Sequence, residues 1–386
     1  MSTFSTPFPQ KKSTQFRGSV VYSVSEICSP TIRKIREECT VKFPVDKQFL
    51  IDCFKELVEI PSPVGYDLQL RPALERYAAK FGYTITYDRR GTPYIELEGQ
   101  DNSKTVLLGA HADTLGLMVR HIESDGKLLV RALGGINYCN IEGSTVTVYT
   151  RDGRSYTGMM VCRSHSVHVF LDARTLPRND ETMFILLDED VHSKEEVQAL
   201  GIQNGDIVHI EPDCEFTETG YLKSRFIDDK AAVACAFAML KYLSENKLKP
   251  KYRTLLAFPY REEIGVGGRY VPEEVSEYIA VDIGLIGPQH AGDERKVSIC
   301  AKDKNGPYDY ALINRLIGYA EKAEVPYVLD VFLNYSTDGN AAVRGGNNLI
   351  AADFGMACWC SHGRERTHID GIEATTQLML AYVLDI

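Results

Sequence analysis

Three short apolar runs, each ending in ionisable side chains, constrain the fold of this chain more than any other feature of its sequence. They are TVLLGA at 105–110, TLLAFPY at 254–260 and YIAVDIG at 278–284. A near-continuous apolar run of this length is typical of a strand that is buried on both faces, as in a sheet covered by helices. We therefore expect an α/β fold with a mixed, largely parallel sheet flanked by helices.

Periodic patterns around these runs support the same fold class. They predict helices over 47–60, 68–81 and 228–245, and a pair of short strands over 83–98. Pro61 ends the first helix. Asp228 and Asp229 open the third helix, where they are well placed for the positive end of the helix dipole.

The segment 116–220 has a different character. Short alternating strands are separated there by hairpin signals such as Ser124-Asp125-Gly126 and Asp152-Gly153. This pattern predicts a small β-domain, a barrel, inserted into the α/β domain. The expected organisation is an N-terminal extension over 1–45, a catalytic α/β domain over 46–115 and 221–386, and the inserted barrel over 116–220.

Composition excludes several classes of protein. The chain has 386 residues and a formal net charge of −10, which disfavours nucleic acid or an anionic membrane as a partner. It has no run that approaches the ~18 apolar residues needed to cross a bilayer. The ten cysteines lack a framework spacing, which indicates reduced thiols in a cytoplasmic protein rather than a disulfide scaffold.

The N-terminal residues are compositionally distinct. Residues 1–25 contain no acidic side chain, several Ser and Thr, and three basic residues. That composition resembles an organelle transit peptide, but we favour a disordered or loosely docked tail. The segment has no apolar core of the kind found in a secretory signal, so we do not expect export.

Ionisable side chains gather where the predicted strands end, and ligands bind beyond the carboxyl ends of strands in open α/β sheets. Asp228 lies at the start of a predicted helix, and His368 follows the apolar run 349–358. The residues at the strand ends are His111, Asp113, Glu262, Glu263 and Asp282. Imidazoles and carboxylates from distant parts of a chain suit zinc or a similar divalent ion.

Each of these residues also has an ordinary structural interpretation when it is taken alone. His111 could be a hydrogen-bonded core histidine, and the Asp228-Asp229 pair could be a helix cap. The local pattern Cys358-x-Cys360-x-His362 is interpreted as buried thiols that precede a histidine, because no second pair completes a tetrahedral site. The joint occurrence of the ionisable residues at equivalent points is what favours a metal site.

At this level of detail the sequence resembles the glutamyl, deblocking and tetrahedral aminopeptidase family of co-catalytic metallopeptidases. The resemblance runs in order from about residue 46 to the C-terminus. Its motifs are GAHADTLGLMV at 109–119, SRFIDDK at 224–230, REEIGVGG at 261–268, AVDIG at 280–284 and RTH at 366–368.

The resemblance implies a role for each residue. Asp228 would bridge two divalent ions, because one carboxylate has two oxygens. The expected ions are Zn²⁺, in preference to Co²⁺ or Mn²⁺. His111 and Asp282 would complete one metal site, and Glu263 and His368 the other. Glu262 would be the general base, with Asp113 orienting His111. The family also implies a cis peptide between Asp228 and Asp229.

Two positions depart from the common family pattern. Lys230 stands where arginine is usual, and Glu365 stands three residues before His368, where arginine is also usual. The variant pattern resembles a branch linked to a bacterial osmoprotectant-dipeptide system. His362 competes with His368 for the last ligand position, and we prefer His368 because it carries the motif.

The expected function is therefore removal of N-terminal residues from peptides by a di-metal hydrolase. The family further implies a homo-oligomer, in which dimers build a dodecamer and the inserted barrel serves as a dimerisation or lid domain. Two alternatives stay open: a deacylase or amidohydrolase of N-acylated or modified dipeptides, and a non-catalytic scaffold protein. A glycosidase fits poorly, because its two carboxylates would flank a sugar.

Overall fold

The computed structural model describes residues 41–386, and its central layer is a ten-stranded sheet. The strands follow the spatial order β1-β2-β12-β3-β13-β18-β15-β16, with β14 beside β18 and β17 beside β15. Their bounds are β1 Ile85–Tyr87, β2 Pro93–Leu97, β3 Asp101–Gly109, β12 Tyr252–Ala257, β13 Val275–Val281, β14 Gly284–Leu285, β15 Val297–Asp303, β16 Gly306–Pro307, β17 Tyr327–Val331 and β18 Ile350–Cys358. The central pairs β12–β3, β3–β13 and β13–β18 are parallel, so the prediction of a mixed, largely parallel sheet is confirmed.

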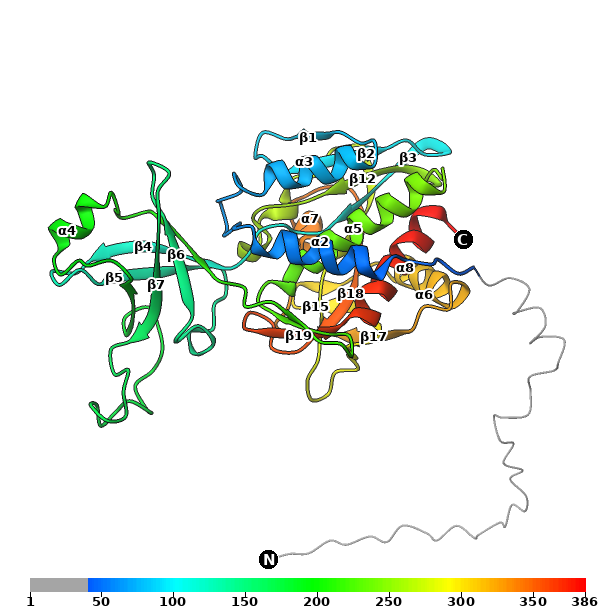
Figure 1. The fold of residues 1–386 in the computed structure, drawn as a ribbon. Coiled ribbons are helices and arrows are strands. Elements are labelled where there is room, and N and C mark those ends of the chain that lie inside the picture. The colour runs from blue at the N-terminus through cyan, green and yellow to red at the C-terminus, as the bar shows by residue number, and fades with distance from the viewer. Residues whose placement is uncertain (1–40) are drawn as a thin grey trace, which may run out of the picture. The chain divides into compact units, whose positions relative to one another are not determined.

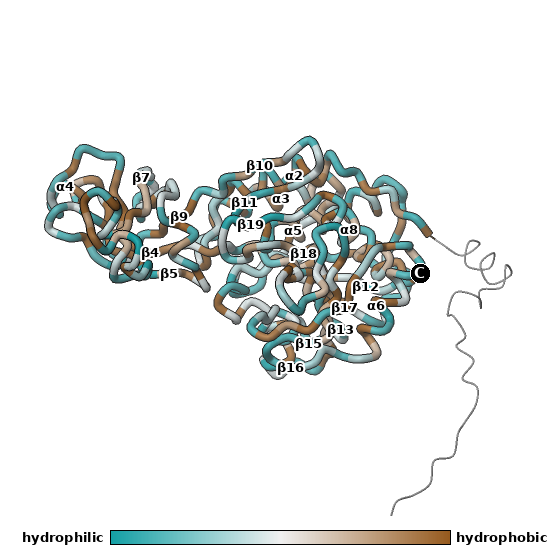
Figure 2. Tube along the Cα trace, turned by 90° about the horizontal axis from the view of Figure 1, so that it is seen from below, coloured by the Kyte–Doolittle hydropathy of each residue, from teal (hydrophilic) through white to brown (hydrophobic). Residues whose placement is uncertain are grey.

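Between residues 41 and 386, six helices accompany this sheet. They are α2 Lys47–Glu59, α3 Arg71–Lys80, α5 Ile227–Glu245, α6 Tyr310–Lys322, α7 Asp338–Arg344 and α8 Ile369–Leu384. Helix α5 packs between α2 and α8 (Figure 1), and most of its side chains are buried. Its small residues, Ala231, Ala232, Ala234 and Ala236 among them, allow this close contact. Figure 2 shows hydrophobic segments along the central strands and hydrophilic segments along the outer loops.

The helices predicted from periodicity are present, with one shifted start. Helix α3 begins at Arg71 rather than at residue 68, because Asp67 and Leu70 form turns that precede it. Pro72 lies in its first turn, where proline is tolerated since the first backbone N–H groups have no partner within the helix.

A closed six-stranded barrel lies between β3 and α5 in sequence. Its order is β4-β5-β8-β7-β6-β9, and the prediction of a barrel is confirmed. The bounds are β4 Gly116–Ile122, β5 Leu128–Leu133, β6 Thr145–Tyr149, β7 Ser155–Cys162, β8 Met183–Leu187 and β9 Ile207–Ile210, with helix α4 Lys194–Ala199 before β9. Gly126 and Gly153 have φ values of +85° and +87°, as their turns require. A separate three-stranded sheet joins β10 Glu215–Phe216, β11 Tyr221–Ser224 and β19 Glu365–His368.

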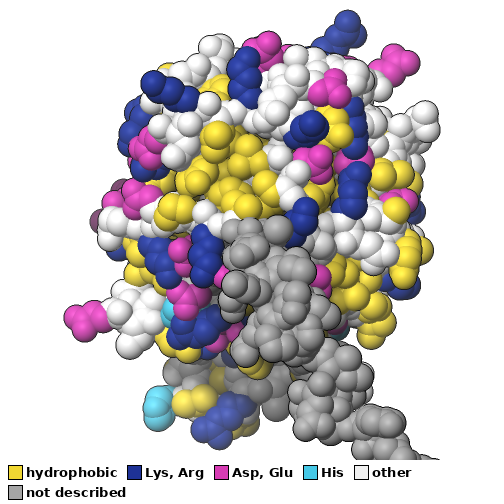
Figure 3. Space-filling model, turned by 90° about the vertical axis from the view of Figure 1, so that its right-hand side faces the viewer, with side chains coloured by type: hydrophobic (Ala, Val, Ile, Leu, Met, Phe, Trp, Pro, Cys, Tyr) yellow, Lys and Arg dark blue, Asp and Glu magenta, His cyan; other side chains and the backbone are white. Residues whose placement is uncertain are grey.

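Surface features agree with the composition. Figure 3 shows a face on which Lys and Arg are interspersed with Asp and Glu around a group of hydrophobic side chains. Because the two signs alternate, this face has no strong electrostatic potential of a single sign. Within residues 41–386, no helix is long and apolar enough to cross a membrane. The eight cysteines of this range are free thiols. The predictions for residues 1–25 lie outside the described residues.

A buried histidine of the barrel predicts that the free energy of unfolding depends on pH. His209 in β9 is 1% exposed, and neither of its ring nitrogens has a hydrogen-bond partner among the described residues. Burial, with a smaller contribution from Lys230, lowers the pKa of His209 to about 3. The pKa of an unfolded histidine is about 6.5, so between these values the unfolded state binds the proton and the folded state does not. The free energy of unfolding should therefore fall by about 2 kcal/mol from this residue between pH 7 and pH 5.

The variant His209→Gln, which cannot take up that proton, isolates the effect. Chemical denaturation at pH 7 and pH 5 should show that the free energy of unfolding decreases less in the variant than in the parent. An equal loss in both proteins would contradict the assignment.

Candidate metal centre

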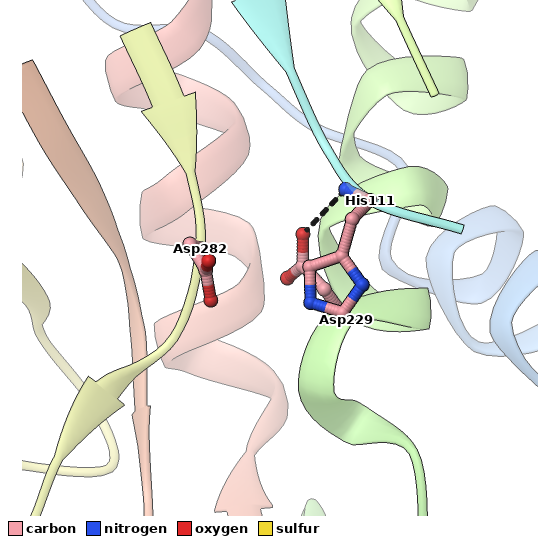
Figure 4. Close-up of side chains that lie close together, drawn as sticks. All are labelled: His111, Asp229 and Asp282. Carbon is pink, nitrogen blue, oxygen red and sulfur yellow. Dashed lines mark hydrogen bonds between the residues drawn. The ribbon is translucent and has the colours of Figure 1, made fainter. Parts of the chain in front are cut away.

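The centre lies at the carboxyl ends of three adjacent strands and at the start of α5. His111 and Asp113 follow β3, Glu262 and Glu263 follow β12, and Asp282 follows β13. Strand β3 pairs with both β12 and β13, so the topology brings these segments to one edge of the sheet. Figure 4 shows His111, Asp229 and Asp282 converging from three different elements.

Asp228 faces His111 across the centre. The Nε2 atom of His111 lies 2.9 Å from Oδ1 of Asp228, and both side chains are buried. The Nδ1 atom of His111 lies 3.1 Å from the main-chain carbonyl of Asp113. A carbonyl can only accept, so Nδ1 donates, and Nε2, which faces Asp228, is the ring nitrogen that would bind a metal ion.

His362 faces the other oxygen of Asp228. Its Nε2 atom lies 3.8 Å from Oδ2 of Asp228 and 3.5 Å from Oε2 of Glu263. Its Nδ1 atom lies 2.9 Å from the carbonyl of Gly135, to which it donates. The same tautomer argument places the Nε2 lone pair of His362 toward Asp228 and Glu263.

The contacts of His368 favour His362 over the expected His368 as a metal ligand. Nε2 of His368 donates to the carbonyl of Thr219 at 2.8 Å. Its Nδ1 accepts from the backbone N–H of Asp370 at 3.0 Å, where His368 caps α8, and lies 3.1 Å from a nitrogen of Arg295. Both ring nitrogens are therefore engaged elsewhere, and no lone pair is left for a metal.

Asp113 fixes the segment that carries the two glutamates. Its Oδ1 accepts from the N–H of Glu262 at 3.1 Å and its Oδ2 from the N–H of Glu263 at 3.3 Å. These glutamates form a 3₁₀ turn, Glu262–Ile264, which ends at Gly265 with φ +68°. This irregular backbone lets both carboxylates reach the centre, which a regular strand would prevent.

Glu365 is a residue whose function the sequence did not reveal. Its Oε2 accepts from the N–H of Asp228 at 3.1 Å, and its Oε1 accepts from the N–H of His362 at 3.2 Å. The side chain is 2% exposed. One buried carboxylate thus holds the backbones of Asp228 and His362 together. In the sequence, Glu365 is only an acid where arginine is usual, which gives no indication of this role.

Asp229 was also assigned no ligand role from the sequence. Its Oδ2 accepts from the N–H of His111 at 3.2 Å (Figure 4), while its buried Oδ1 has no partner among the described residues. The Asp228-Asp229 peptide is cis, as the resemblance implied.

The buried carboxyl groups and imidazoles of the centre fit a cation. Burial, together with neighbouring carboxylates, raises the pKa of Glu262 and Glu263 well above the usual value and that of Asp282 to about 7. Two groups, His111–Asp229–Asp282 and His111–Asp228–Glu263, each bring three donor atoms within 4.8 Å of one another. Buried carboxylates are paired or coordinate metals, and this N/O donor set suits zinc or a similar divalent ion, so the residues fit a metal centre.

A cavity of about 400 Å³ opens beside this centre. Five of the residues that line it belong to the centre: Asp228, Glu262, Glu263, Asp282 and His362. The rest of the lining consists of Gly265, Leu285, Asn334, Tyr335, Ser336 and Ser361. Its size suits a small ligand or the end of a peptide.

The two histidines can be separated by a matched pair of variants. His362→Asn should lower metal affinity by about 100-fold, because a facing donor is lost. His368→Asn keeps an acceptor at the cap of α8 and should retain the metal content of the parent. Metal analysis of both variants after dialysis is the measurement, and loss of metal from the His368 variant alone would restore the original preference.

Comparisons with known proteins identify the family of the chain. The family model for the M42 glutamyl aminopeptidases matches residues 91–378. YhfE of Bacillus subtilis (strain 168) is 39% identical over 334 residues, which cover 86% of this chain and 96% of YhfE. The glutamyl aminopeptidase of Lactococcus lactis is 25% identical over 224 residues, which cover 58% of this chain and 62% of that enzyme.

Solved structures share the fold. The aminopeptidase APDkam598 from Desulfurococcus kamchatkensis has a TM-score of 0.78 at 23% identity, and the match covers 88% of this chain and 96% of that one. A dodecameric structure of PhTET1 has a TM-score of 0.75 at 23% identity, with 87% and 99% covered. The prediction of a metal-dependent aminopeptidase is thus confirmed at the level of the family: the chain belongs to the M42 glutamyl aminopeptidase family.

Proposed function

We propose that this protein removes N-terminal residues from peptides with the help of two divalent metal ions, zinc by preference. The observation that carries the proposal is the position of Asp228, whose two oxygens face the Nε2 atoms of two different histidines. His111 and Asp282 would hold one ion, and Glu263 and His362 the other, with Asp228 shared. Such a pair would supply Lewis-acid polarisation of the scissile carbonyl and lower the pKa of an attacking water.

Glu262 would move the proton in this reaction. Its Oε2 lies 3.9 Å from His111 Nε2, and its side chain lines the cavity. A carboxyl whose pKa is raised by burial can take a proton from the attacking water and give it to the leaving amine. Asp113 would support both steps by holding the backbone N–H groups of Glu262 and Glu263.

The acidic lining favours a free amine over an acylated one. Asp228, Glu262, Glu263 and Asp282 line the cavity, and their oxygens can accept hydrogen bonds from the three N–H groups of an α-ammonium group. An acylated amine offers only one N–H group and carries no positive charge. We therefore prefer an aminopeptidase to the alternative deacylase, and paired assays of a free and an N-acetylated anilide of the same amino acid separate the two.

Chelation tests the requirement for metal. Removal of bound ions with a chelator should abolish peptide hydrolysis, by about 1,000-fold or more, because Glu262 alone cannot activate a water at neutral pH. Addition of Zn²⁺, Co²⁺ or Mn²⁺ should restore it. Hydrolysis that continues at the original rate in metal-free protein, verified by elemental analysis, would contradict the proposal. A chain that neither binds metal nor hydrolyses any peptide would favour the scaffold alternative.

Assembly and location form part of the same proposal. Solved structures with this fold include a PhTET1 dodecamer and a TET1 peptidase of Pyrococcus horikoshii that assembles into a tetrahedron or an octahedral shell. We propose a homo-oligomer in which dimers build a dodecamer, with the barrel in a dimerisation or lid role. A cytoplasmic location is supported by the free cysteines of the described residues.

A further inference from the structure

We infer that the cavity selects peptides whose first residue carries an uncharged side chain. This inference rests on the proposed function and names the substrate class of the same site. It differs from the preferences implied by the names of two relatives, the glutamyl aminopeptidase of Lactococcus lactis and the lysyl aminopeptidase of Pyrococcus furiosus.

The first step concerns charge in the loaded centre. The cavity is lined by four carboxylates and one imidazole of the metal centre, and among the described residues its lining includes no Lys or Arg. The formal charges of four carboxylates and two divalent ions cancel. The loaded centre would then carry no net formal charge, so a charged side chain of the substrate would meet no counter-charge in the lining.

The second step concerns the wall that the metal centre does not use. Leu285 of β14 offers an apolar surface, while Asn334, Ser336 and Ser361 offer neutral hydrogen-bonding groups. An acidic first residue would bury a carboxylate without a cation, and a basic one would bury an ammonium without a dedicated carboxylate. Both cases are strongly unfavourable, whereas an aliphatic or small polar side chain loses little on entry.

The third step concerns Tyr335, which also lines the cavity. Its hydroxyl is buried next to the carboxyl group of Asp282. The ring is held by an edge-on contact with Phe332 at 5.1 Å between centroids. A neutral hydroxyl in this position can pair with a neutral polar group of the substrate, and it cannot neutralise a charged one.

A panel of amino-acid anilides tests the inference on the metal-loaded full chain. The panel contains leucine, alanine, serine, glutamate and lysine as the first residue. We expect kcat/KM for the best neutral substrate to exceed that for glutamate and for lysine by about 100-fold, and by at least tenfold. A glutamate or lysine substrate within tenfold of the best neutral one would overturn the inference and leave the proposed function intact. Hydrolysis of none of the five would overturn the proposed function and the inference together.

A charge introduced at the exposed residue Asn334 gives a second, independent arm. Asn334→Lys places an ammonium group at the wall, and Asn334→Gln is the uncharged control. The ratio of kcat/KM for glutamate to that for leucine should be at least tenfold higher in the lysine variant than in the glutamine variant. Binding of free glutamate and free leucine, measured by calorimetry, should shift in the same direction. An unchanged ratio in both measurements would show that this wall does not select the first side chain.

Discussion

Replacement of Asp228 by alanine should remove both metal ions and lower peptide hydrolysis by about 10⁴-fold or more. The reason is geometric. Oδ1 of Asp228 is 2.9 Å from Nε2 of His111, and Oδ2 is 3.8 Å from Nε2 of His362, so the side chain serves both halves of the centre. Elemental analysis of dialysed protein, together with kcat for a neutral anilide, measures both effects.

A matched control keeps this result specific. Asp206 is a fully buried aspartate immediately before β9 in the barrel, where its Oδ2 accepts from the N–H of Gln203. Asp206→Asn removes a buried carboxylate without touching the metal centre and should retain both ions. Unchanged metal content in Asp228→Ala would contradict the shared-ligand geometry.

Replacement of Glu262 by glutamine should produce a different failure. The variant should bind the same amount of metal, and kcat should fall by about 10²–10⁴-fold, the range expected for loss of a general base. The neighbouring substitution Glu263→Gln should instead lower metal content, because Glu263 Oε2 faces the Nε2 atom of His362. Full activity in Glu262→Gln would remove its proposed role in proton transfer.

Much of the fold was readable from the sequence because burial leaves a periodic trace. The apolar runs at 105–110, 254–260 and 278–284 became the central strands β3, β12 and β13. Ligands gather beyond the carboxyl ends of parallel strands, and this rule was enough to predict that His111 and Asp282 lie near one another. Local patterns therefore determine both the strands and the residues at their ends.

The identity of the second histidine could not be read in the same way. His362 and His368 are only six residues apart, and which of them has a free ring nitrogen depends on partners far along the chain. The carbonyl of Gly135 accepts a hydrogen bond from Nδ1 of His362. Thr219 and Arg295 contact the two ring nitrogens of His368. These tertiary contacts leave no signal in local spacing.

Glu365 was missed for a related reason. A motif comparison records it as an unexpected acid, but its two oxygens join the backbone N–H groups of Asp228 and His362. His362 has a φ value of +63°, which a non-glycine residue rarely adopts, so its backbone needs such support. The partnership spans 137 residues between Asp228 and Glu365, beyond the reach of periodicity.

Anomalous diffraction from crystals grown with Zn²⁺ tests the central claim most directly. We predict two peaks, about 3.5–4 Å apart, on either side of Asp228, one next to His111 and the other next to His362. A single peak, or a peak at His368 with none at His362, would contradict the account.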